Sequence, residues 1–188
     1  IASNIKLNHD KFNLKILEST PKGVGNARNL GVKLASYQYL TFIDDDDYVS
    51  ENYLEELLYH ADEKSIVFSQ ILDDKDGVTA DNPINHQLHN FEHIDNVRYN
   101  DISSIVTLNA CKLVPYKFLE HIEYDNQLNS GEDVVYWLEV ISKNNPKIKI
   151  TSFKKSCIYY RTLRENSVSR RPTSFDFNIT ERLEVVKR

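Results

Sequence analysis

The chain has 188 residues, enough for one domain with a sizeable hydrophobic core. Apolar residues make up 40% of it and charged residues 27%, which is ordinary for a globular protein. Its formal net charge of −5 excludes the basic surplus that nucleic-acid binding usually requires, so we expect no nucleic-acid partner. Cys111 and Cys157 lie far apart and form no Cys-x-x-Cys pair, which predicts neither a zinc site nor a disulfide framework.

Apolar periodicity predicts strands and helices in alternation along the chain. We expect strands over residues 14–17, 39–43, 66–68, 105–108, 147–153 and 156–161. We expect helices over residues 26–36, 50–61, 115–122, 132–143 and 175–188, a turn at 76–77 and a long loop over 80–101. This alternation predicts an α/β fold with a mainly parallel sheet flanked by helices. Residues 1–172 form the expected domain, and residues 173–188 an expected helical extension.

Four adjacent aspartates, Asp44 to Asp47, follow the apolar strand over 39–43. Two unit charges ~4 Å apart repel by about 4 kcal/mol at an effective dielectric near 20, so such a run must be solvated or hold a cation. The carboxyl end of a strand is where open α/β sheets bind ligands. Alternate residues of an extended chain point the same way, so Asp44 and Asp46 could hold Mg²⁺ or Mn²⁺ together with substrate phosphates. The alternative is a solvated acidic turn in which Asp47 or Ser50 caps the next helix.

Three further segments carry candidate binding or catalytic residues. Arg28 lies near the start of a helix, after two glycines. At this position it could bind phosphate oxygens, and the alternative is an ion pair with a surface acid. Glu132 and Asp133 lie at the start of a helix with one apolar face. A structural explanation is available, because Ser130 can cap this helix and acidic residues in its first turn complement the helix dipole. Residues 159–171 contain four arginines and two serines, which suits either a loop over phosphates or a solvated basic linker.

Two of these segments together resemble glycosyltransferase family 2, the inverting enzymes with the GT-A fold. The resemblance rests on the sequence Gly-Val-Gly-Asn-Ala-Arg-Asn-Leu-Gly at 23–31, followed by Tyr-Leu-Thr-Phe-Ile-Asp-Asp-Asp-Asp at 39–47. In that family a Gly-x-x-x-Ala-Arg-Asn stretch opens a helix, and a strand then runs into Asp-x-Asp-Asp. The resemblance covers about residues 14–170 and lacks the family's first strand-helix-strand unit. We therefore expect exposed apolar surface there, covered by a partner chain or by further residues.

The resemblance also implies roles for individual residues. Asp46 would bind the divalent cation, and Asp44 would support the ribose or the metal shell. Asp133 would be the general base, with Glu132 positioning it or binding the acceptor. The expected donor-binding residues are completed by Arg28, Asp45, Asp47, Arg161 and Ser167.

The function implied is metal-dependent, inverting sugar transfer from a nucleoside-diphosphate sugar, expected to be UDP-linked, to a saccharide or lipid-linked acceptor. Bacterial surface polysaccharide synthesis is the expected setting, by association with the family. We expect a cytoplasmic location, at the inner face of the membrane if there is peripheral contact, and leave oligomerisation open. The alternatives are a Mg²⁺-dependent phospho- or nucleotidyltransferase, and an inactive transferase-like domain that binds sugar or protein.

Overall fold

The computed structural model describes residues 14–94, 96–128 and 130–164, and the expected helix over 175–188 lies outside them. Its α-helices are α1 (Val24–Leu34), α2 (Tyr53–His60), α3 (Pro83–His89), α4 (Ser103–Val106) and α5 (Glu132–Asn144), with 3-10 helices at Tyr99–Ile102, Tyr116–Phe118 and Phe153–Lys155. Its strands are β1 (Tyr39–Leu40), β2 (Tyr48–Val49), β3 (Ser65–Phe68), β4 (Gln70–Lys75), β5 (Val78–Ala80), β6 (Lys112–Pro115), β7 (Lys147–Ile150) and β8 (Ile158–Thr162). No helix in these described ranges is both long and apolar enough to cross a bilayer.

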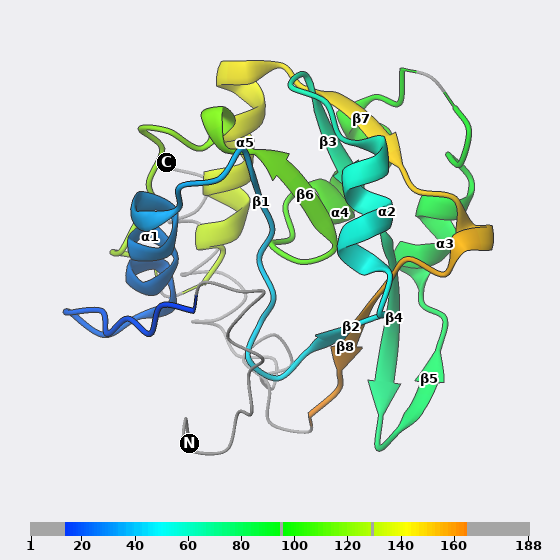
Figure 1. Cartoon of the computed structure of the whole chain (residues 1–188), viewed down its shortest axis with the longest axis horizontal. Helices are drawn as coiled ribbons and strands as arrows, with labels where there is room; N and C mark the ends of the chain where they lie inside the picture. The colour runs from blue at the N-terminus through cyan, green and yellow to red at the C-terminus, as the bar shows by residue number, and fades with distance from the viewer. Residues whose placement is uncertain (1–13, 95, 129, 165–188) are drawn as a thin grey trace, which may run out of the picture.

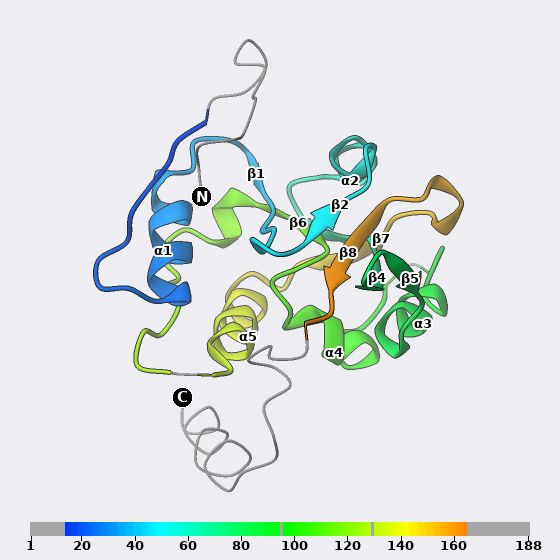
Figure 2. The same cartoon turned by 90° about the horizontal axis from the view of Figure 1, so that it is seen from below.

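Two four-stranded sheets form the centre of the fold, in the orders β1-β6-β3-β7 and β2-β8-β4-β5. β3 pairs with β7 and β4 with β8 in parallel, and the other neighbouring strands are antiparallel. Figures 1 and 2 show α2 on one side of the strands, α4 and α5 on the other, and α1 beside β1. The α/β class is confirmed, but the sheets are mixed rather than mainly parallel.

One continuous chain segment contributes a strand to each sheet, because only Ser69 separates β3 from β4. The Ser69 amide donates to Cys111 O, and the next amide, of Gln70, donates to Cys157 O. The chain therefore changes partners within one residue and leaves no backbone amide unpaired there. This switch places β8, and with it Tyr159, beside the end of β1.

An aromatic cluster packs α5 against the first sheet. Trp137 is fully buried, and Tyr136 stacks on Tyr124 with 3.8 Å between ring centroids. Asn109 Oδ1 accepts hydrogen bonds from Trp137 Nε1 at 2.9 Å and from the Tyr124 hydroxyl at 2.5 Å. One buried amide oxygen thus satisfies two buried donors and fixes the segment around Tyr124 against α5.

Several predicted elements differ from the structure. Residues 14–17 form no strand, 105–108 overlap α4, and 115–122 contain the end of β6 and a 3-10 helix. A short apolar run does not distinguish a strand from a buried helix, which explains the second error. The expected loop over 80–101 contains α3. Asn82 caps the start of this helix, because its side chain accepts a hydrogen bond from the Asn85 amide, and Pro83 occupies the first helical position.

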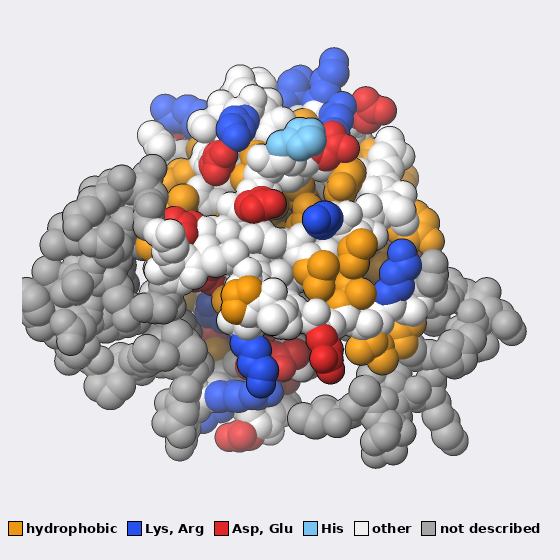
Figure 3. Space-filling view, turned by 90° about the vertical axis from the view of Figure 1, so that its left-hand side faces the viewer, with side chains coloured by type: hydrophobic (Ala, Val, Ile, Leu, Met, Phe, Trp, Pro, Cys, Tyr) orange, Lys and Arg blue, Asp and Glu red, His pale blue; other side chains and the backbone are white. Residues whose placement is uncertain are grey.

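Helix α1 forms where expected, but its buried face is not the apolar one. Its buried residues are Gly25 and Val32, whereas Leu34 is exposed. Figure 3 shows hydrophobic side chains exposed on the face that carries α1, and the exposed ones in this part of the chain include Leu14, Ile16, Leu17 and Val24. Whether apolar surface is exposed on the sheet itself, and what would cover it, stays a prediction.

Replacing Asn109 with alanine is expected to lower the free energy of unfolding by about 2–4 kcal/mol, because the Trp137 and Tyr124 donors would be left buried without an acceptor. Urea unfolding measures the loss. The matched control is Asn90→Ala, at an exposed asparagine after α3, which should change little. Equal losses in the two variants would contradict a special role for the buried amide.

Candidate active site

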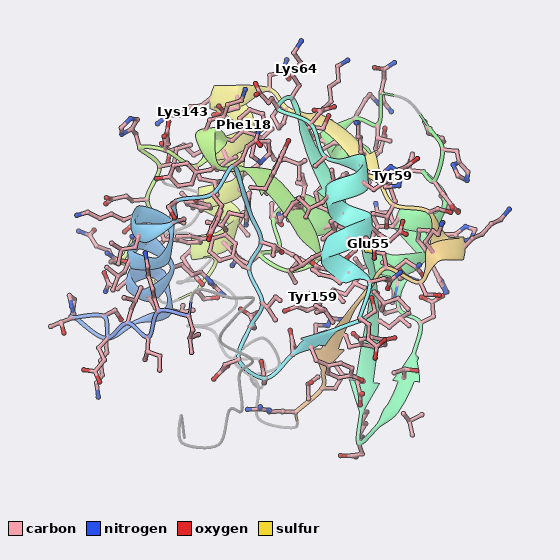
Figure 4. All side chains as sticks on the ribbon, viewed as in Figure 1. Glu55, Tyr59, Lys64, Phe118, Lys143 and Tyr159 are labelled. Carbon is pink, nitrogen blue, oxygen red and sulfur yellow. The ribbon has the colours of Figure 1, made fainter. Side chains whose placement is uncertain are left out.

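The candidate site lies where two helices begin and the loop after a strand passes, on the same side of the molecule. The N-terminal ends of α1 and α5 and the loop after β1 meet at one end of the first sheet (Figure 1). Phe118, Lys64 and Lys143, labelled in Figure 4, mark the opposite end. Residues 28, 44–47 and 132–133, which are distant in the sequence, are thereby brought to one region.

Arg28 connects these segments directly. Its Nη2 lies 3.0 Å from Asp44 Oδ1, and its Nη1 lies 3.2 Å from Glu132 Oε1. The Arg28 and Glu132 side chains are only 14% and 15% exposed, whereas that of Asp44 is 44% exposed. The pair with Glu132 is therefore the better shielded from solvent.

The aromatic cluster holds Arg28 in place. Its guanidinium carbon lies 5.6 Å from the centre of the Tyr124 ring, within cation–π range. The neighbouring Asn29 exchanges two hydrogen bonds with the Tyr124 backbone, at 2.7 and 3.1 Å. A Cβ at Gly25 would lie 3.0 Å from Asn126 Oδ1, so a side chain at this position of α1 would require the Asn126 side chain to shift.

The four aspartates form a turn and not the extended segment that we expected. The Asp47 amide donates to Asp44 O at 3.1 Å, so the argument from alternate residues does not hold. The Tyr159 hydroxyl accepts from the Asp44 amide at 3.1 Å and donates to Asp47 Oδ2 at 2.7 Å. The Thr162 amide donates to Asp47 Oδ1 at 2.8 Å. In Figure 4 Tyr159 points from β8 toward this turn, which ties it to the second sheet.

Asp47 therefore has a structural function in the turn, whatever it binds. Burial raises the pKa of this carboxyl, and the charges of Asp46 and Asp44 raise it further, while its hydrogen bonds to Thr162 and Tyr159 lower it. Asp45 is exposed. Asp46 Oδ2 lies 3.4 Å from Arg164 Nε, so a cation of the protein is already close to the expected metal ligand.

The donor set fits a hard divalent cation only if substrate supplies further ligands. Within the described ranges no group of three or more His, Cys, Asp or Glu side chains could hold a metal ion. Asp44 and Asp46 offer carboxylate oxygens from one turn. Such a pair suits Mg²⁺ or Mn²⁺ completed by phosphate oxygens and water, and not a closed protein cage.

Helix α5 begins at the two acidic residues. Gly131 precedes them at φ 77°, a left-handed conformation that favours glycine, and Ser130 does not cap the helix as expected. Burial and the neighbouring Glu132 charge raise the pKa of Asp133, while the Val134 amide, Arg28 and Lys112 lower it. A carboxyl with a raised pKa beside a paired carboxylate is a pattern typical of catalytic acids and bases.

The two predicted donor-binding residues at the C-terminal side, Arg161 and Ser167, stay untested by the geometry. Arg161 pairs with Asp73 on β4, with Nε and Nη2 lying 2.8 and 2.6 Å from Oδ1. Ser167 lies outside the described residues. The sequence analysis also missed Tyr159 and Tyr124. Tyr159 lies in the strand that was predicted over 156–161, so its position in a strand could have been noticed. We find no signal in the sequence for Tyr124.

The family model "Glycosyl transferase family 2" matches residues 1–122, a range that contains Arg28 and the four aspartates but not Glu132 and Asp133. The minor teichoic acid biosynthesis protein GgaB of Bacillus subtilis is 30% identical over 149 residues, which are 77% of this chain and 16% of that protein. An uncharacterized glycosyltransferase of Rickettsia bellii is 25% identical over 77% of this chain and 21% of its own. The chain thus spans about a fifth of these relatives.

Solved structures of S. aureus TarS share the fold. The complex of TarS with UDP-GlcNAc superposes with a TM-score of 0.62 and 23% identity, covering 81% of this chain and 42% of that one. A further TarS structure gives a TM-score of 0.61 at 22% identity. The expected GT-A architecture is thereby confirmed. From the match of its model over more than half of the residues, the chain belongs to glycosyl transferase family 2.

Proposed function

We propose that this chain carries the catalytic centre of a metal-dependent, inverting glycosyltransferase that uses a nucleoside-diphosphate sugar. The single observation that carries the proposal is the bridge from Asp44 through Arg28 to Glu132. It places a turn of carboxylates suited to a cation and diphosphate next to a helix start with a carboxyl suited to proton transfer. An inverting transfer needs these two functions side by side.

On the donor side, Asp46 and Asp44 would hold Mg²⁺ or Mn²⁺. When bound, the cation would supply Lewis-acid stabilisation of the diphosphate leaving group. The Arg28 guanidinium is held by the Tyr124 ring and by two carboxylates, so its position at the donor side is fixed. Asp45, Asp47, Arg161 and Ser167 stay predicted donor contacts.

On the acceptor side, Asp133 would take the proton from the attacking hydroxyl. Its Oδ1 accepts the Val134 amide at 2.8 Å, so we expect the proton at Oδ2. Burial favours the neutral form of this carboxyl and makes it a better base than an exposed aspartate. The Glu132 charge raises the pKa of Asp133 further, and Arg28, which pairs with Glu132, partly offsets this effect.

The relatives support a finer assignment. GgaB is named for teichoic acid biosynthesis and one TarS structure contains UDP-GlcNAc, so we propose a UDP-sugar donor and a saccharide or lipid-linked acceptor in surface-polymer synthesis. The chain spans about a fifth of the curated relatives, so the donor, the acceptor and the pathway are proposals drawn from whole proteins that are much longer. A cytoplasmic location, at the inner face of the membrane, is part of the proposal.

A thermal-shift screen of UDP, UDP-sugars and other nucleotide sugars, each with and without Mn²⁺, tests the donor side. We expect stabilisation by a UDP compound only with metal, of about 2.7 kcal/mol at a ligand concentration 100 times Kd. Asp46→Asn should abolish the shift. Asp76→Asn, in the exposed β4–β5 turn, is the matched control and should retain it. Nucleotide binding that depends neither on metal nor on Asp46 would refute the proposed donor site.

Asp133→Asn separates sugar transfer from the rival phosphoryl chemistry. We expect it to retain metal-dependent nucleotide binding and to lose sugar transfer by roughly 100-fold or more, because only the base is removed. The measurement is transfer from the donor found in the screen. Full turnover in Asp133→Asn, together with none in Asp46→Asn, would favour a phospho- or nucleotidyltransferase. Binding without any turnover in the unaltered protein would favour an inactive binding domain.

The same variant is expected to stabilise the fold at neutral pH. The folded-state pKa of Asp133 lies above its ordinary value of 3.8, so ionising this carboxyl lowers stability as the pH rises through the folded-state pKa. Asp133→Asn should therefore raise the free energy of unfolding at pH 7, and the gain should shrink as the pH falls toward 4. Urea unfolding across this range measures it. A gain that does not change with pH would show that ionisation is not its cause.

A further inference from the structure

Lys112 on β6 is a buried cation that the proposed mechanism does not use. Its residue is 1% exposed, and its Nζ donates to Val106 O at 2.7 Å. The same Nζ lies 3.6 Å from the centre of the Trp137 ring and 5.5 Å from that of Phe68. Across the described ranges no carboxylate lies within salt-bridge distance of it. One carbonyl and two ring faces therefore replace the water shell of this ammonium group.

Stability alone does not explain a lysine at this position. Burying an ammonium group without a carboxylate partner is unfavourable, and an apolar side chain of similar length usually stabilises such a site as well or better. Burial lowers the pKa of Lys112 to about 7, which shows how strongly the site opposes the charge. A buried ionisable group of this kind beside a candidate active site suggests a function.

Geometry connects Lys112 to the candidate base. Trp137 lies four residues after Asp133 on α5, so the two side chains project from the same face of the helix. The ammonium group against Trp137 therefore lies beneath the first turns of α5. Asn109, in the loop before β6, accepts a hydrogen bond from Trp137 Nε1, and the Phe68 ring of β3 faces the same ammonium group.

The charged and titratable groups that face Asp133 come from every element around it. Glu132 on the same helix raises its pKa, whereas Arg28 from α1 and Lys112 from β6 lower it. The Tyr124 phenol also interacts with it. Lys112 in turn is faced by Cys111 and by Asp133. Arg28 already pairs with Glu132, whereas Lys112 forms no ion pair with any carboxylate in the described part of the chain.

We propose that Lys112 is a positioning residue for the candidate base: its buried ammonium group supports the charged form of Asp133 from beneath, and its contact with Trp137 holds the start of α5 in place. The role of the base rests on the proposed function, whereas the coupling between the two groups does not. Each of the two groups favours the charged form of the other, so a change at one is expected to move the titration of the other.

Carbon-13 NMR titration of aspartate carboxyls tests the coupling without any substrate, with Asp133 assigned from Asp133→Asn. In Lys112→Met the midpoint of Asp133 is expected to rise by about one pH unit, because a nearby positive charge is lost. The matched control is Lys117→Met, which removes an exposed lysine paired with Glu63 and should leave the midpoint unchanged. An unchanged midpoint in a folded Lys112→Met variant would overturn the proposal.

A reciprocal measurement covers the case in which Lys112→Met does not fold. Heteronuclear NMR of the Lys112 side chain should show a titration near pH 7 in the unaltered protein and a lower midpoint in Asp133→Asn, since the Asp133 charge raises the pKa of this lysine. An unmoved lysine midpoint would also overturn the proposal. If the midpoints move but Asp133→Asn retains sugar transfer, the coupling stands and the assignment of the base fails.

Discussion

A single guanidinium group holds the candidate site together. Arg28 contacts Asp44 and Glu132, which lie 16 and 104 residues away in the sequence. Without it, the turn of aspartates and the acidic start of α5 would repel each other across a partly desolvated region. The bridge allows the turn of aspartates and the acidic start of α5 to occupy one end of the sheet, which is the arrangement that the proposed glycosyl transfer would use.

The parts of the site that rest on local chemistry were predictable from the sequence. Four adjacent acids after an apolar strand, and an acidic pair at the head of α5, indicated a charged site at the sheet end, and α5 forms as expected. The residues that connect these parts were not predictable. Tyr159 joins Asp44 and Asp47 only because the chain changes sheets at Ser69, which no local pattern indicates.

Errors in the predicted fold share a physical cause. β6 was missed because it begins with Lys112, whose charge hides a fully buried strand from any hydrophobicity pattern. The exposed face of α1 was assigned to the core because its buried face carries Arg28 and Asn29, whose contacts are with Asp44, Glu132 and the Tyr124 backbone. In both elements local polarity contradicts the fold at residues that serve the candidate site, which is where such conflict is expected.

A double-mutant cycle between Arg28 and Glu132 tests most directly whether the two halves form one site. Arg28→Met, Glu132→Gln and the double variant would be compared by urea unfolding at pH 7. With side chains 14% and 15% exposed, the pair is expected to show a favourable interaction energy of about 1–3 kcal/mol. Additive losses, with no interaction energy, would mean that Arg28 is not coupled to the start of α5, and would contradict the account.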